Sequence, residues 1–353
     1  MEITFLVGNG FNTSLGLKTR YADFYQYLRQ LMSNGNSNLK NNPIIRSIET
    51  HFINPEEKRW SDLELGLGEF TGNCNCQPEE FLEHKNEIDM LLYQYLDKEQ
   101  MKFHADELCE EGLGKYASVF KNSLVKFVDF FPPDDKKVLS NVITSYREKV
   151  KYNIIDFNYT SIVDDIWDIT AIKSEHNGKL SGNSETFPHF LGEKMHVHGE
   201  LGFTPILGVD NLGQIANIEW RQTPSFSELL IKERMNIIAK QDRTNQAKRL
   251  INNSAIICVY GMSIGKTDQM WWQELANWLA VNNRHKLVIY AHCENRNALI
   301  QNVYEKRKIE NKYWQRLREN ISFDEKKWQS IRNSIFIQNS QLIFDFPETP
   351  ETN

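Results

Sequence analysis

Several apolar runs in this chain end on polar residues of the types that bind ligands or transfer protons. The residues at these run ends are Gly8, Asn9 and Gly10; Asp156 and Asn158; His196 and His198; Gly261 and Ser263, with Asp268 shortly after; and His292. In open sheets of parallel strands, ligands bind beyond the carboxyl ends of the strands. If each run is a strand of one such sheet, these side chains converge on a single site.

The first run, residues 3–7, opens directly into the turn Gly8-Asn9-Gly10. Glycine carries no side chain and tolerates a sharp bend, so a phosphate or a ribose could approach the amides of such a turn. The N-terminus of a following helix would add partial positive charge there. The spacing is not G-x-G-x-x-G, however, and a plain strand-to-helix connection explains the turn equally well.

The paired histidines and the Asp-x-Asn pair suggest two kinds of chemistry. Residues two apart in a strand share a face, so Asp156 and Asn158 are expected to point the same way, as are His196 and His198. Histidine titrates near neutral pH and suits a general base, although a hydrogen-bonded structural role is the commoner one. Alternatively, His196, His198 and Asp156 could bind a metal ion for a hydrolase or nuclease, because imidazole and carboxylate are familiar metal ligands.

The elements that must position these residues alternate between strands and helices, as in β-α-β units. Short apolar runs predict strands at residues 152–157, 194–198, 205–209, 255–260 and 286–291, and helical periodicity lies between several of them, as at 226–252 and 268–281. Residues 335–337 and 342–344 could form a hairpin at a sheet edge. We therefore predict an α/β fold with a doubly wound, mostly parallel, Rossmann-like sheet. A largely helical insertion or cap at 41–150 would separate the first strand, in 1–40, from the remaining core, in 151–353.

Composition excludes some classes of function. The net charge of −6 disfavours a nucleic-acid partner, because phosphate binding needs clustered Lys and Arg. No uncharged apolar run is long enough to span a bilayer and no basic leader precedes one, so we expect a cytoplasmic protein with no membrane partner. The five cysteines form no paired C-x-x-C modules, and we interpret all of them, including Cys74 and Cys76, as reduced thiols.

Five motifs follow one another through most of the chain: Gly8-Asn9-Gly10-Phe11-Asn12 with residues 16–24, Trp60-Ser61-Asp62-Leu63-Glu64, Phe157-Asn158-Tyr159-Thr160, His196-Val197-His198-Gly199 and Tyr260-Gly261-Met262-Ser263. In these motifs and their order the chain resembles the bacteriophage abortive infection AbiH family. The order of the glycine turn, the Asn-containing strand end, the His-Gly pair and the Gly-x-Ser strand end is also similar, more distantly, to sirtuin-like NAD-binding domains.

These resemblances imply a set of roles. Asn158 would position water or the nicotinamide ribose, His198 would act as base, and Asp156 would stabilise positive charge or orient His198. Residues around the glycine turn and the later strand ends would bind NAD: Gly8, Asn9, Gly10, Phe11, Thr19, Gly261, Ser263 and Asp268, with 292–295 flanking the adenosine half. Thr160 stands where sirtuin-like domains have aspartate, and the four-cysteine zinc module of sirtuin deacylases is missing, which argues against protein deacylation. No metal is expected.

The resulting hypothesis is an antiphage defence protein that binds NAD or a related nucleotide and hydrolyses its nicotinamide–ribose bond. The alternatives are a non-catalytic nucleotide-binding or interaction module, and the metal-dependent enzyme described above. A phage-derived trigger or partner protein is expected, and self-association stays open. Glu64 is either a carboxylate partner of His198 or of a ribose hydroxyl, or else a surface residue.

Overall fold

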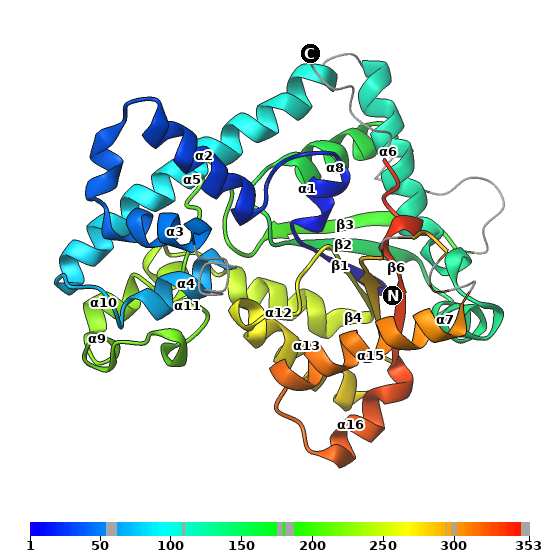
Figure 1. The fold of residues 1–353 in the computed structure, drawn as a ribbon. Helices are drawn as coiled ribbons and strands as arrows, with labels where there is room; N and C mark the ends of the chain where they lie inside the picture. Colours follow the sequence, from blue (N-terminus) through cyan, green and yellow to red (C-terminus); the bar gives the residue numbers. More distant parts are fainter. Residues whose placement is uncertain are drawn as a thin grey trace.

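The computed structural model describes residues 1–53, 62–107, 110–174, 179–180, 187–293, 295–297, 299 and 302–346. Within these residues, parallel strands form one sheet in the order β3-β2-β1-β4-β5-β6 (Figure 1). The strands are β1 (Glu2–Val7), β2 (Val150–Asp156), β3 (His189–His196), β4 (Ser254–Tyr260), β5 (Lys286–Ala291) and β6 (Ile335–Asn339). This arrangement confirms the doubly wound parallel sheet, whose strand order reverses between β1 and β4.

The central strands are apolar along their length because helices cover both faces of the sheet. Phe5 contributes to the hydrophobic cluster on one face, and its neighbour Leu6 contributes to the cluster on the other. The first face packs against α6 (Glu110–Val125), α7 (Pro133–Ser145) and α8 (Ile162–Ile172); the second packs against α12 (Arg243–Asn253), α13 (Gln269–Val281), α15 (Val303–Asn320) and α16 (Glu325–Ile331). None of the helices in the described ranges is both long enough and apolar enough to cross a membrane.

A third hydrophobic cluster forms a helical cap beside the carboxyl ends of the strands (Figure 1). The cap comprises α2 (Tyr21–Ser33), α3 (Pro43–Ile53), α4 (Leu63–Phe70) and α5 (Pro78–Glu107), together with α9 (Ile218–Arg221) and α10 (Pro224–Glu228) from a distant part of the chain. α11 (Lys232–Ile238) follows α10. The part of the chain that packs in the cap therefore does not coincide with residues 41–150. α2 precedes residue 41 and packs in the cap, whereas α6 and α7 precede residue 150 and pack on the sheet.

Two predicted strand arrangements are wrong. Residues 205–209 form no strand; the amide of Ile206 donates to the carbonyl of His198 and that of Val209 to Leu230, so these hydrogen bonds join loops. The predicted terminal hairpin is absent from the described residues. β6 instead pairs in parallel with β5, and a 3₁₀ turn at Ser340–Leu342 leads away from the sheet.

Two other predicted elements differ in extent. The strand expected at 194–198 ends at His196, so His198 follows the strand rather than lying in it. The helical stretch expected at 226–252 is divided into three helices, α10, α11 and α12. Lys240 lies between the last two with φ +54°, a left-handed conformation that a continuous helix does not contain.

The cysteines do not all stay reduced. Cys74 and Cys76 form a disulfide in the loop between α4 and α5, where their Cα atoms lie 5.4 Å apart, within the range that a disulfide requires. Cys258 and Cys293 are buried free thiols. Cys109, like Trp60, Ser61 and Glu294 of the predicted motifs, lies outside the described residues.

The loops after β1 and β4 make a close backbone contact where the strand order reverses. The amide of Gly8 donates to the carbonyl of Tyr260, and the amide of Gly10 donates to the carbonyl of Gly261, both at 2.9 Å. A Cβ atom at Gly10 would lie 2.3 Å from the Cα of Gly261. Gly10, which begins the short helix α1 (Gly10–Ser14), is therefore explained by packing against a second backbone.

We predict that Gly10→Ala destabilises the fold, because the added methyl group forces the two loops apart. Overpacking of this kind costs about 1–3 kcal/mol of the free energy of unfolding, measured by urea denaturation. Gly265→Ala in the loop after β4 is the matched control, since its Cβ would meet no atom nearer than 3.4 Å. Equal stability of the two variants would contradict the packing role of Gly10.

Candidate functional site

Two adjoining cavities open at the carboxyl ends of the strands. The His198 cavity, of about 730 Å³, lies between the sheet and the cap, and the His292 cavity, of about 640 Å³, lies toward β5 and the C-terminal segment. Residues that line both are Asn9, Arg20, Gly261, Met262, Ser263 and Arg316. The boundary between the cavities thus coincides with the loops at the reversal point of the sheet.

Most of the predicted site residues lie in these cavities. The predicted residues that line the His198 cavity are Gly8, Asn9, Thr19, Asn158, His198, Gly261, Ser263 and Asp268. Gly10 and His292 line the other cavity. The structure therefore gathers residues from four separate stretches of the sequence around one volume.

Two predicted site residues line neither cavity. Phe11 is fully buried in the core, where its ring packs 5.3 Å from that of Phe344, measured between centroids, and so leaves no side-chain surface for a cofactor. Asp156 is buried at the end of β2, where its Oδ1 accepts from both the main-chain and side-chain nitrogens of Asn158, at 2.8 and 2.7 Å. Asp156 thus holds Asn158, which itself lines the cavity.

The amides of Gly8, Gly10 and Phe11 at the glycine turn form hydrogen bonds within the protein. Besides the bonds of Gly8 and Gly10 to the loop after β4, the amide of Phe11 donates to the carbonyl of Gly8 at 2.9 Å. The side chain of Asn9 is held by Thr19, whose carbonyl accepts from Asn9 Nδ2 at 2.9 Å. A phosphate in either cavity would therefore meet side chains at the cavity boundary, chiefly Ser263, Arg20 and Arg316, rather than these amides.

His198 is buried at the wall of its cavity as a neutral imidazole. Its Nε2 lies 3.4 Å from Asp268 Oδ1, while its Nδ1 is buried with no hydrogen-bond partner among the described residues. Burial and the nearby charge of Lys232 together lower the pKa of His198 to about 4, although Asp268 acts in the opposite direction. Near neutral pH, with Nε2–H directed at Asp268, Nδ1 carries a lone pair that can accept a proton.

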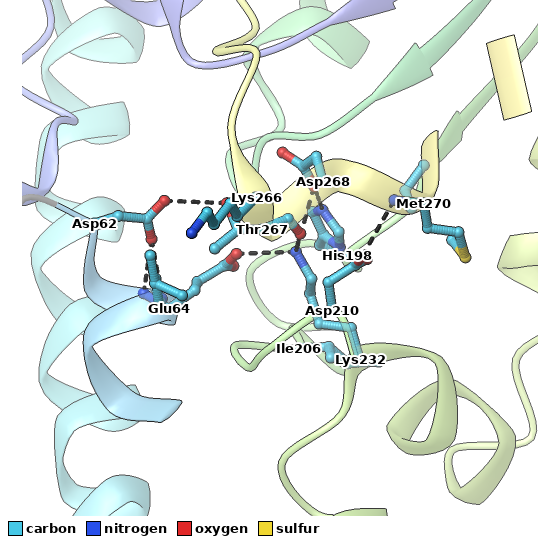
Figure 2. Close-up of polar contacts among 12 residues, drawn as sticks. Asp62, Glu64, His198, Ile206, Asp210, Lys232, Lys266, Thr267, Asp268 and Met270 are labelled. Atoms are coloured by element: carbon cyan, nitrogen blue, oxygen red, sulfur yellow. Dashed lines mark hydrogen bonds and ion pairs between the residues drawn. The ribbon is translucent and has the colours of Figure 1, made fainter. Parts of the chain in front are cut away.

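A buried lysine links this histidine to the cap. Figure 2 shows Lys232 between Glu64 and Asp268, with its Nζ 2.9 Å from Glu64 Oε2 and 3.3 Å from Asp268 Oδ1. The same Nζ donates to the carbonyl of Thr267 at 2.7 Å. Glu64 is therefore neither a surface residue nor a direct partner of His198. Lys232 and Asp268 link the two, and Tyr159, whose hydroxyl donates to Glu64 Oε1 at 3.3 Å, also packs beside His198.

Local structure places Glu64 and Lys232 for this contact. Asp62 is the N-cap of α4, and its Oδ1 accepts from the amide of Glu64 at 3.0 Å, while its Oδ2 accepts from Thr267 Oγ1 at 3.0 Å. The amide of Lys232 donates to the carbonyl of Val209 at 3.0 Å. These hydrogen bonds fix the main chain at Glu64 and at Lys232, from which the two side chains extend toward each other.

The charges of this network depend on one another. Burial would lower the pKa of Lys232, but Asp268 and Glu64 raise it above its usual value. Burial would raise the pKa of Asp268, but Lys232 and His198 hold it below the ordinary range. Burial raises the pKa of Glu64, and Lys232 only partly opposes that rise. Lys232 and Asp268 therefore stay charged, and His198 stays neutral.

His196 belongs to a different cluster from His198. Its Nε2 lies 2.5 Å from Asp164 Oδ2 and 4.0 Å from Asp156 Oδ2, and its Nδ1 contacts the carbonyl oxygen of Asn158 at 2.9 Å. The prediction that the two histidines point the same way is therefore wrong, because β3 ends at His196 and the two-residue alternation of a strand no longer applies at His198. Neither the metal set of His196, His198 and Asp156 nor the orientation of His198 by Asp156 is realised.

Sequence reasoning missed several residues of this region. Lys232 follows three apolar residues and begins the charged run Lys232-Glu233-Arg234, which is typical of a solvated face and gives no local signal of its burial. Asp164 lies in the first turn of α8, where an acidic residue is expected for helix stability alone. Arg20 follows the predicted turn, and Arg316 lies in a helix whose mixed charges are typical of a solvated face. Their place at the cavity boundary depends on packing between distant segments.

We predict that Lys232→Met strongly destabilises the protein, because it leaves Glu64 and Asp268 buried without a cation. Breaking a buried pair in this way costs about 3–5 kcal/mol of the free energy of unfolding, measured by urea denaturation. The control Arg249→Met removes an exposed pair with Glu193 and is expected to change the free energy of unfolding far less, because solvent screens an exposed pair. A Lys232→Met variant as stable as the control would show that the network carries little of the stability.

Comparison with known proteins agrees with the motifs. The family model of bacteriophage abortive infection AbiH matches residues 4–290, from β1 to the end of β5. No curated protein is similar enough to count as a match. The matched range includes the cap, the glycine turn, Asn158, His198, Lys232 and Asp268. Because the match covers much more than half of the chain, this protein belongs to the bacteriophage abortive infection AbiH family.

Proposed function

We propose that this AbiH protein binds NAD or a related nucleotide across its two cavities and hydrolyses the nicotinamide–ribose bond in the His198 cavity. The observation that carries the proposal is the placement of Asn158 and His198 on one cavity, with His198 neutral and its Nδ1 without a partner among the described residues. Its membership of a phage abortive infection family supports a role for this reaction in phage defence.

The two cavities suit the two halves of a dinucleotide. The diphosphate would lie at the boundary, where Arg20 and Arg316 supply positive charge and Ser263 supplies a hydroxyl group. The adenosine half would occupy the His292 cavity, beside Tyr313 and Tyr290. The nicotinamide ribose would then reach Asn158 and His198. A ligand that spans the reversal point of a doubly wound sheet is the usual arrangement in this fold class.

The reaction needs a base and a positioned water more than it needs an acid. As the bond between the ribose C1′ and the nicotinamide nitrogen breaks, its electron pair goes to the nitrogen, which neutralises the ring, and positive charge builds on the sugar. A water molecule attacks C1′ and loses a proton to Nδ1 of His198. Asn158, fixed through its Nδ2 by Asp156, would hold that water or a ribose hydroxyl.

Acidic groups of the network support the developing charge. Asp268 stays ionised beside His198 and would stabilise the imidazolium that forms when Nδ1 takes the proton. Asp62 also lines the cavity and would contribute negative charge near the sugar when ionised. The role that sequence reasoning gave to Asp156 therefore passes to Asp268 in this mechanism, while Asp156 positions Asn158.

The competing function is a nucleotide-binding module without turnover. It predicts tight NAD binding with no release of nicotinamide. Incubation of the purified protein with NAD, followed by chromatography of free nicotinamide and by calorimetry of binding, separates the two functions.

We predict that His198→Ala binds NAD with nearly unchanged affinity but releases nicotinamide about 10²- to 10⁴-fold more slowly, because a general base acts mainly in the transition state. Asn158→Ala is expected to slow the reaction through loss of positioning. His84→Ala on α5 is the control, as it lies outside both cavities. Cleavage by His198→Ala at the wild-type rate would eliminate this mechanism.

The pH profile gives a second prediction. A base must be unprotonated, and His198 takes up its proton only near pH 4 rather than near the ordinary 6.5. The kcat/KM for NAD is therefore expected to stay level as the pH falls from 8 to about 5.5, and to decline only below that. Circular dichroism at each pH verifies that the protein is folded. A decline centred near pH 6.5 would mean that the base is a different, more exposed group.

A further inference from the structure

A compact group of two carboxylates and an imidazole lies behind Asn158, outside the two cavities. Asp156 ends β2, His196 ends β3, and Asp164 lies in the first turn of α8. One ligand atom from each residue lies within 4.8 Å of the other two. Glu200 is close as well, with its Oε2 3.9 Å from His196 Nε2.

One carboxylate oxygen of this group has no hydrogen-bond partner among the described residues. Asp156 Oδ2 accepts no hydrogen bond from any described residue. Water cannot easily supply one, because the side chain is only 2% exposed. It faces His196 Nε2 at 4.0 Å, too far for a hydrogen bond. A buried carboxylate oxygen without a donor is costly, and a bound cation removes that cost.

We propose that Asp156, Asp164 and His196 bind one divalent metal ion of the Mn²⁺ or Zn²⁺ type, with Glu200 as a fourth ligand. Carboxylate oxygens and a single imidazole nitrogen suit these ions. The ligand atoms would be Asp156 Oδ2, Asp164 Oδ2 and His196 Nε2. This set differs from the one considered from sequence, because Asp164 takes the place of His198.

Binding would exchange one proton for the metal. His196 Nε2 now contacts Asp164 Oδ2, so its proton would leave to solvent as the metal enters. Asp164 Oδ1 would keep its ion pair with Lys194, at 2.9 Å. His196 Nδ1 already contacts the carbonyl oxygen of Asn158, the kind of second contact that orients a metal-bound histidine.

The site would act on the cavity through Asn158. Asp156 Oδ1 holds the main-chain and side-chain nitrogens of Asn158, and His196 holds its carbonyl oxygen. Two ligands of the metal would therefore fix the residue that lines the His198 cavity. The metal would be a positioning element, remote from the bond that the proposed function breaks, and metal binding itself does not rest on that function.

The test is titration of the full-length, chelator-treated protein with MnCl₂, followed by calorimetry and by loss of the free Mn²⁺ signal in electron paramagnetic resonance. We expect one site per chain and a Tm that rises with Mn²⁺ concentration. Asp164→Asn and His196→Gln are expected to weaken binding by at least about 10- to 100-fold. Asp168→Asn is the matched control, because Asp168 also pairs with Lys194 but is 63% exposed and outside the group.

Three results would overturn the proposal: no Mn²⁺ or Zn²⁺ binding at millimolar concentration, equal binding by Asp164→Asn and the wild type, or loss of the site in His198→Ala. If His196→Gln does not fold by circular dichroism, Glu200→Gln provides the second variant, with weaker binding expected. His198→Ala should bind Mn²⁺ normally while it fails to release nicotinamide. Absence of NAD cleavage in the wild type with normal Mn²⁺ binding would refute the proposed function and leave the metal site intact.

Discussion

The contact of Lys232 with Glu64 and Asp268 is the interaction on which the arrangement of the cavity wall depends. Lys232 begins α11, Glu64 belongs to the first turn of α4 in the cap, and Asp268 lies in the turn before α13, which covers the sheet. A buried charge without a partner is far more costly than one at the surface. Moving any one of the three segments away would leave such a charge, so the contact holds all three in place. The contact therefore fixes the cap on the edge of the sheet.

The same contact sets the state of the buried histidine. Burial, followed by the charge of Lys232, lowers the pKa of His198 and so favours its neutral form. The positive charge of Lys232 lowers the pKa of Asp268, which therefore stays ionised. A neutral imidazole next to an ionised carboxylate is a suitable arrangement for taking up a proton during a reaction. Stability of the network and chemistry of the cavity thus rest on one set of charges.

Two histidines separated by a single residue serve two separate clusters. β3 ends at His196, which faces Asp164 and Asp156, whereas His198 follows the strand and faces Asp268. Burial would lower the pKa of His196, but Asp156 and Asp164 raise it to about 9. The pKa of His196 is therefore raised, whereas that of His198 is lowered. Asn158 is the link, since it lines the cavity and is also held by Asp156 and His196.

The parallel sheet and the convergence of its strand ends can be predicted from the order of the residues. Continuous apolar runs predict strands buried on both faces, and parallel strands must end at one edge, so the pattern of residues alone places Asn158, His198, Ser263 and Asp268 together. The strands can be predicted because the spacing of apolar residues in a short segment reflects which of its side chains are buried.

The pairing of the polar groups, in contrast, depends on how distant segments pack in the folded protein. Glu64 and Lys232 are 168 residues apart, and neither carries a local sign of the other. The use of the Gly8 and Gly10 amides by the loop after β4, and the different directions of His196 and His198, likewise depend on where the chain bends and which distant backbone it meets. The physical reason is that a hydrogen bond or an ion pair is set by distances of a few ångströms between segments, and residue type and spacing do not encode those distances.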